Sequence, residues 1–182
     1  MPTLLRTAKL PGSDVRVVAL SSVGHKGFSQ EFNFPDIKTD MRGTIPLNLY
    51  GQSKLANLLF VKSLARYYPQ ITTASVHPGT VKTDIWNKAD GHPILRILLK
   101  PAIAMTGVTS EEGAKNQLWC CTSGDIKSGT YYEPIGKAGQ ESSLAKDDAL
   151  AEKLWRWTEE ELKIDGGSRW VKNEDMLERS GL

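Results

Sequence analysis

Hydrophobic positions along this chain fall into short apolar runs separated by segments with helical spacing. The run 15–20 is rich in β-branched residues and does not alternate, which predicts a strand buried on both faces of a parallel sheet. The run 71–77 predicts a second strand. A third, shorter run at 128–134 also predicts a strand. Apolar residues at helical spacing predict helices at 49–67, about 110–121 and 146–162, and residues 4–10 resemble the end of another helix.

The order of these elements predicts an α/β fold with a doubly wound parallel sheet, because parallel strands need helical crossovers. Three strands are visible, whereas a typical sheet of this kind has about six. We therefore expect residues 1–182 to form one incomplete domain, with a polar C-terminal tail at 163–182.

Two segments have no clear period. Residues 23–49 predict an unusually long loop, which is uncommon unless the loop has a function or is disordered. The apolar run Ile94–Met105 is too short to span a membrane, so it is a buried helix, a lid over a substrate pocket or an interfacial patch.

Composition narrows the class of protein. The chain has 182 residues, 23 basic against 21 acidic residues and a net charge of +2, and the scattered basic side chains do not indicate a nucleic-acid groove. Cys120 and Cys121 are adjacent, a spacing that fits neither a disulfide framework nor a metal site. With no signal peptide and no membrane-spanning run, we expect a soluble, cytoplasmic protein without a bound metal.

The candidate chemistry begins with Tyr50 and Lys54, which project from the same helical face one turn apart. A phenol beside an ammonium group can serve as an acid and a base, because the cation favours the phenolate. Tyr-x-x-x-Lys also occurs by chance on many helices. However, Ser22 and the Pro78-Gly79 pair follow the first two strands, where ligands bind in open α/β sheets.

Together these motifs resemble the short-chain dehydrogenase/reductase family, especially its retinol-dehydrogenase-like and fungal branch. The resemblance runs from about Leu4 to Leu162 and implies a Rossmann-like sheet of which this chain holds the C-terminal portion. It implies that Ser22 polarises a substrate carbonyl, that Tyr50 donates or accepts the proton, and that Lys54 favours the phenolate and binds the nicotinamide ribose. If the resemblance is set aside, Ser22 is a turn residue and Lys54 a solvated helix lysine.

The same resemblance implies an NAD(P)-dependent oxidoreductase, with NADP favoured over NAD, acting on a carbonyl or alcohol. The apolar run at 94–105 would suit a hydrophobic substrate. A loop beside the nicotinamide would bind the cofactor together with Tyr50 and Lys54. The residues that match this loop are Pro78, Gly79, Val81 and Thr83.

The Gly-rich turn that binds the cofactor's pyrophosphate has no counterpart in this sequence. We therefore expect weak cofactor binding and an unpaired edge at the strand 15–20, which a partner such as a second copy of the chain would cover. The alternative is an inactive remnant that acts only as a binding or oligomerisation partner.

The three histidines and two of the tryptophans are not assigned to the site. We expect His25 and His92 to lie in solvated loops and His77 to be structural. Trp155 and Trp157 are expected to be packing residues.

Overall fold

Three parallel strands form the centre of the protein. The structure, a computed structural model, describes residues 1–27, 32–82 and 107–164. The strands are β1 (Arg16–Leu20), β2 (Thr72–Val76) and β3 (Thr130–Tyr132), in the sheet order β1-β2-β3. Val17 pairs with Thr73, and Ala74 pairs with Thr130. The predicted three-stranded parallel sheet is therefore confirmed.

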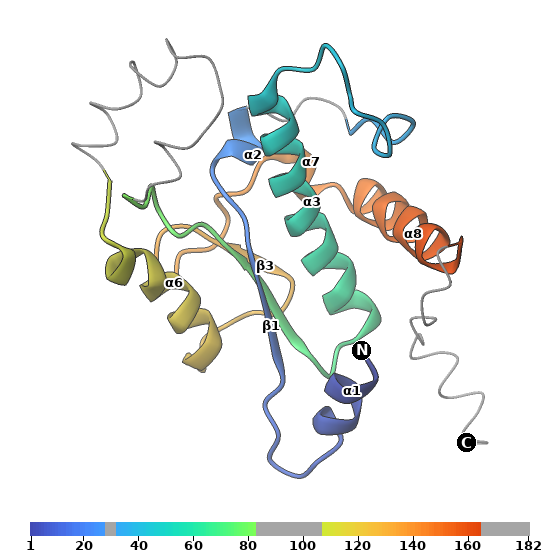
Figure 1. The fold of residues 1–182 in the computed structure, drawn as a ribbon. Coiled ribbons are helices and arrows are strands. Elements are labelled where there is room, and N and C mark those ends of the chain that lie inside the picture. Colours follow the sequence, from blue (N-terminus) through green and yellow to red (C-terminus); the bar gives the residue numbers. More distant parts are fainter. Residues whose placement is uncertain (28–31, 83–106, 165–182) are drawn as a thin grey trace.

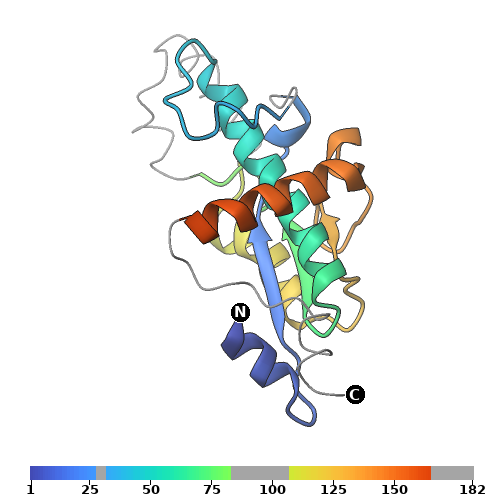
Figure 2. The same ribbon diagram turned by 90° about the vertical axis from the view of Figure 1, so that its right-hand side faces the viewer.

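Helices cover both faces of this sheet (Figures 1 and 2). They are α1 (Pro2–Ala8), α2 (Gly24–Gly27), α3 (Pro46–Tyr67), α6 (Ser110–Thr122), α7 (Ser143–Lys146) and α8 (Asp148–Ile164). Val17 and Tyr131 pack on the side of α3 and α8, whereas Val18 and Tyr132 pack on the side of α6. Neighbouring residues of one strand thus face opposite layers, as the non-alternating apolar pattern predicts.

The two crossover connections have opposite hands. The strands run in sequence order across the sheet, yet α3, between β1 and β2, lies on one face and α6, between β2 and β3, lies on the other. Two connections that advance in the same direction on opposite faces cannot share a hand. One of them therefore departs from the right-handed rule that most parallel crossovers follow.

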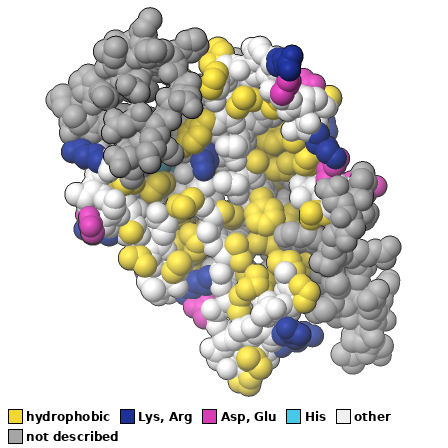
Figure 3. Space-filling model, viewed as in Figure 1, with side chains coloured by type: hydrophobic (Ala, Val, Ile, Leu, Met, Phe, Trp, Pro, Cys, Tyr) yellow, Lys and Arg dark blue, Asp and Glu magenta, His cyan; other side chains and the backbone are white. Residues whose placement is uncertain are grey.

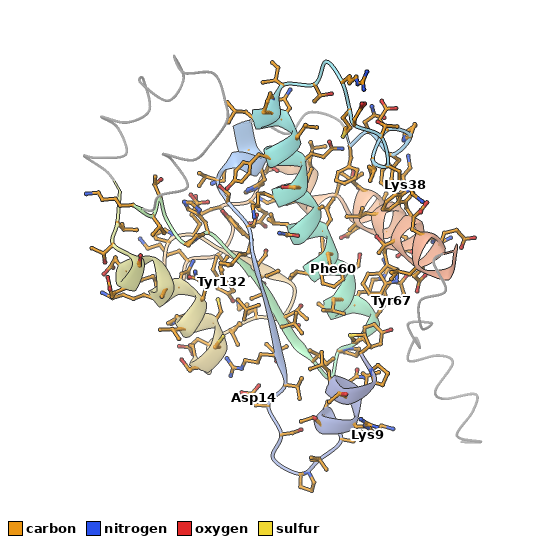
Figure 4. All side chains as sticks on the ribbon, in the orientation of Figure 1. Lys9, Asp14, Lys38, Phe60, Tyr67 and Tyr132 are labelled. Atoms are coloured by element: carbon orange, nitrogen blue, oxygen red, sulfur yellow. The ribbon has the colours of Figure 1, made fainter. Side chains whose placement is uncertain are left out.

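Helix α3 is the central element of the core. Pro46 begins it with a fixed φ angle, and Leu55 and Leu59 are fully buried within its length. Phe60 and Tyr67 project from α3 toward α8 (Figure 4), where both stack on Trp155, with ring centroids 5.8 and 5.2 Å away. Trp155 is 4% exposed, so the prediction that it is a packing residue is confirmed.

Two short helices differ from the sequence prediction. Helix α6 begins at Ser110, in agreement with the predicted start near residue 110, and its N-cap is Thr109, whose side chain accepts a hydrogen bond from the Glu112 amide at 3.2 Å. The short helices α2 and α7 were not predicted, since four residues are too few to show a helical period.

The outer edge of β1 has no strand partner among the described residues. Leu20 at its end is 49% exposed, and hydrophobic side chains extend across the middle of the face in Figure 3. The expectation of an uncovered edge therefore holds for residues 1–27, 32–82 and 107–164. No helix within these residues has the length and apolar character needed to cross a bilayer.

Candidate active site

The turn after β1 brings Ser22 beside Tyr50. Ser22 is 8% exposed, and its hydroxyl accepts a hydrogen bond from the Gly24 amide at 3.1 Å. The Tyr50 ring lies directly on Gly24: a Cβ built there would be 2.9 Å from Tyr50 Cε1 and 3.5 Å from Ser22 Oγ. The absence of a side chain at Gly24 thus allows the tyrosine ring to approach the serine hydroxyl.

Tyr50 and Lys54 lie on one face of α3, as the i, i+4 spacing predicts. The Lys54 ammonium nitrogen is 5.6 Å from the centroid of the Tyr50 ring. Tyr50 is 45% exposed. The structure therefore brings Ser22, Tyr50 and Lys54 into one region at the carboxyl end of β1.

Two side-chain hydrogen bonds fix the end of β1 to α3. Ser21 Oγ donates to the Lys54 carbonyl at 2.9 Å, and Asn57 donates to the Leu20 carbonyl at 2.8 Å. These bonds fix the position of the turn at Ser22 relative to Tyr50 on α3. The first serine of the pair thus has a structural role that differs from the role predicted for Ser22.

The predicted nicotinamide loop begins after β2. Gly79 has a φ angle of +84°, a left-handed conformation that favours glycine, and a Cβ there would lie 3.2 Å from a Val108 methyl. Val81 forms an isolated parallel bridge with Val108. Pro78, Gly79 and Val81 are therefore held at the carboxyl edge of the sheet, whereas Thr83, the run 94–105 and His92 lie outside the described residues.

Gly113 of α6 packs closely against this loop. A Cβ built on Gly113 would lie 2.5 Å from a Val81 methyl and 3.4 Å from the Pro78 carbonyl oxygen. A valine methyl sits on a stiff, branched side chain and has little freedom to move aside. Helix α6 can therefore pack against this loop because residue 113 has no side chain.

Gly113→Ala should destabilise the protein by up to about 2 kcal/mol. Overpacking costs about 1–3 kcal/mol, and the gain in helix propensity of about 1 kcal/mol offsets part of it. In a Val81→Ala background the new methyl has room, so Gly113→Ala should there be neutral or stabilising. Urea unfolding of the four proteins in the cycle measures this coupling, and strictly additive effects would contradict the packing described.

Asn116 is a residue of this region that the sequence prediction missed. It is 3% exposed, and its amide donates to the carbonyls of His77 at 3.0 Å and Tyr132 at 2.9 Å. It thereby joins the ends of β2 and β3 just before the loop at Pro78. The sequence carries a signal for it: Gly113, Asn116 and Cys120 share one helical face, and the other two are small buried residues.

His25 was expected to be solvated, and that prediction is wrong. The side chain is fully buried. Its Nδ1 is 2.6 Å from the Ser22 carbonyl oxygen, and its Nε2 lies 3.2 Å from the Ser142 amide nitrogen. Burial lowers the pKa of His25, so the imidazole stays neutral at neutral pH.

Polar groups near His25 form a second cluster at the same edge of the sheet. Burial lowers the pKa of His77 as well. Burial raises the pKa of Glu133, but hydrogen bonds from Lys26 and Tyr131, each 2.8 Å long, outweigh that effect and hold it below its ordinary value. Glu133 is therefore a carboxylate that pairs with Lys26 at neutral pH.

The arrangement of a parallel sheet between two helical layers defines a Rossmann-like α/β protein. A crystal structure of an uncharacterised protein from Mycobacterium paratuberculosis is similar to it, with a TM-score of 0.56 and 27% identity over 87% of this chain and 54% of that one. No protein-family model matches the sequence.

Curated relatives identify the family. A short-chain dehydrogenase/reductase of Aspergillus calidoustus is 35% identical over 90% of this chain and 56% of its own length. A short-chain dehydrogenase/reductase of Colletotrichum higginsianum is 29% identical over 91% of this chain and 45% of its own length. Retinol dehydrogenase 12 of Bos taurus is 35% identical over 85% of this chain and 46% of its own length.

This chain belongs to the short-chain dehydrogenase/reductase family of oxidoreductases. It spans about half the length of the curated relatives it matches. The match lies in the C-terminal part of those proteins.

Proposed function

We propose that this chain supplies the catalytic part of an NAD(P)-dependent oxidoreductase that interconverts a hydrophobic carbonyl compound and its alcohol. The observation that carries the proposal is the contact of Tyr50 with Gly24 beside the Ser22 hydroxyl, with the Lys54 ammonium 5.6 Å from the ring. These are the residues at which the family places its proton-transfer chemistry. The names of the relatives support the reaction class.

The residues present fit one end of the cofactor. Lys54 is a donor suited to ribose hydroxyls, and the loop at Pro78, Gly79 and Val81 lies at the edge of the sheet where family members hold the nicotinamide. Thr83 would add a hydroxyl to this loop. The pyrophosphate would need a Gly-rich turn, and this sequence contains none, so the fit is to the nicotinamide and ribose end.

The side chains have distinct tasks in the reaction. Bound NAD(P) supplies or accepts the hydride. Ser22 would donate a hydrogen bond to the substrate carbonyl oxygen, because its hydroxyl accepts from the Gly24 amide and its own hydrogen is still available to donate. Tyr50 would give its proton to the same oxygen as negative charge develops there, and Lys54 would stabilise the phenolate that remains.

A nucleotide titration tests the proposal. We expect saturable binding of NADPH, weaker binding of NADH, and amide shift changes at Tyr50, Lys54 and Gly79 in nuclear magnetic resonance spectra. Lys54→Met should weaken NADPH binding by about 10- to 100-fold, since a hydrogen bond from a charged group contributes about 1.5–3 kcal/mol. Lys62→Met is the matched control on α3, because Lys62 pairs with Asp148.

The same titration separates this proposal from the alternative of a binding protein. If neither nucleotide binds saturably up to millimolar concentration, an oxidoreductase role for this chain is wrong. The uncovered edge of β1, with Leu20 49% exposed, is the surface that the alternative would use.

A further inference from the structure

His25 is the one fully buried histidine among the described residues, and its two ring nitrogens have unlike partners. Nδ1 is 2.6 Å from the Ser22 carbonyl oxygen, which can only accept a hydrogen bond. Nε2 is 3.2 Å from the Ser142 amide nitrogen, which can only donate one. These partners require a neutral imidazole with its proton on Nδ1.

This ring connects two segments that are far apart in sequence. Ser22 follows β1, whereas Ser142 is the N-cap of α7 and follows β3. The ring also packs edge-on against Tyr131 of β3, with centroids 5.1 Å apart and planes at 75°. The imidazole thus fixes the turn at Ser22 against an element on the far side of the site.

The turn held in this way is the one that carries the candidate chemistry. The peptide units between Ser22 and His25 include Gly24, whose amide binds Ser22 Oγ and whose Cα supports the Tyr50 ring. A shift of the Ser22 carbonyl would therefore move both the serine hydroxyl and the surface under Tyr50. Small displacements of this kind matter because a misplacement of about 1 Å can cost about 10²-fold in rate.

We propose that His25 is a positioning residue that holds Ser22 in place relative to Tyr50 by accepting the Ser142 amide and donating to the Ser22 carbonyl. This inference rests on the proposed function, because it assigns His25 a task in that same site. His25 acts through Ser22, and its ring nitrogens are both engaged by backbone groups.

Protonation would break this arrangement, because a charged imidazole sets a second N–H against the Ser142 amide. The charged or titratable groups around the ring are Lys26 on α2, Tyr131 on β3, His77 after β2, Glu133 after β3, and Glu141 before α7. Burial outweighs the hydrogen bond to the Ser22 carbonyl and the two carboxylates, so the pKa of His25 lies below its usual value. The stabilisation by His25 is complete above the unfolded-state pKa of about 6.5 and declines as the pH falls below it.

Three variants test the inference. His25→Phe fills the space but binds neither backbone group, and it should lower kcat for carbonyl reduction by about 10- to 100-fold with an unchanged KM for the nucleotide. His25→Asn can still donate to Ser22 and should recover most of that loss. Tyr131→Phe is the matched control: it keeps the ring that packs on His25, and its kcat should equal that of the wild type.

Nuclear magnetic resonance provides a readout that needs no turnover. Ring nitrogen shifts should identify a neutral imidazole protonated at Nδ1, and His25→Phe should speed amide exchange at Ser142 by about 10-fold through the lost hydrogen bond. The stability advantage of wild type over His25→Asn should shrink between pH 7.5 and pH 5.

The outcomes separate the two proposals. A wild-type protein without turnover overturns the proposed function, while ring shifts and amide exchange still decide whether His25 holds the two segments. A proton on Nε2, or a folded His25→Phe with wild-type kcat in an active protein, would overturn the role of His25. If His25→Phe does not fold, the pH dependence of stability decides instead: a stability advantage of wild type over His25→Asn that does not shrink between pH 7.5 and pH 5 would overturn the role of His25.

Discussion

Tyr50→Phe should lower kcat for carbonyl reduction by about 10²- to 10⁴-fold, the usual contribution of a placed general acid. The substitution removes the hydroxyl and keeps the ring that rests on Gly24. The fold should be unaffected, because Tyr50 is 45% exposed and its hydroxyl has no hydrogen-bond partner among the described residues. Steady-state kinetics and a thermal melt of the two proteins measure both effects.

The matched control for this variant is Tyr67→Phe on the same helix. The Tyr67 hydroxyl donates to Glu152, and burial together with that carboxylate raises the pKa of Tyr67 to about 12. Loss of the Tyr67 hydroxyl should lower the stability of the protein by about 0.5–1.5 kcal/mol, as for a typical hydrogen bond, and leave kcat unchanged. Equal kcat values for Tyr50→Phe and Tyr67→Phe would exclude Tyr50 as the proton donor.

Asn116→Leu should destabilise the protein by about 1–3 kcal/mol. The leucine side chain leaves the His77 carbonyl without its amide donor, whereas the Tyr132 carbonyl keeps its hydrogen bond from the His77 backbone amide at 3.1 Å. An unsatisfied buried polar group costs about 1–3 kcal/mol. The loss should also loosen the loop at Pro78, so nucleotide binding should weaken in the fraction that remains folded. Urea unfolding measures the stability change.

Leu118→Ala is the control on the same helix. Leu118 is 59% exposed, so its truncation should change the stability by no more than about 0.5 kcal/mol. An Asn116→Leu protein as stable as this control would show that the amide does not hold the strand ends together.

The sheet and its long helices could be predicted because their patterns are local. The run at β2 is buried on both faces and the run at β1 is half-buried up to the exposed Leu20, while α3 carries buried apolar residues along its length, so the apolar runs mark the right elements. Tyr50 and Lys54 could likewise be placed together, since four residues along a helix fix their relation. Ser22 could be placed at the edge of the sheet because it comes directly after a predicted strand.

The remaining parts of the site depend on contacts between distant segments. His25 sits among glycines and polar residues that indicate an exposed loop, yet it is buried because Ser142 and Tyr131 lie over it. Asn116 has no partner on its own helix, and the carbonyls it binds come from β2 and β3. The absence of a side chain at Gly113 matters because Val81, in the loop after β2, packs against it. No local pattern encodes such pairs.

The most direct test of the proposed function is aldehyde-dependent oxidation of NADPH by the purified chain, with wild type and Tyr50→Phe measured side by side. A panel of aliphatic, aromatic and polyene aldehydes covers the hydrophobic substrates proposed. We predict saturable turnover by the wild type that falls by at least about 10²-fold in Tyr50→Phe. Oxidation that never exceeds the buffer rate in the wild type, or that is equal in both proteins, would contradict the assignment of Ser22, Tyr50 and Lys54 as a catalytic site.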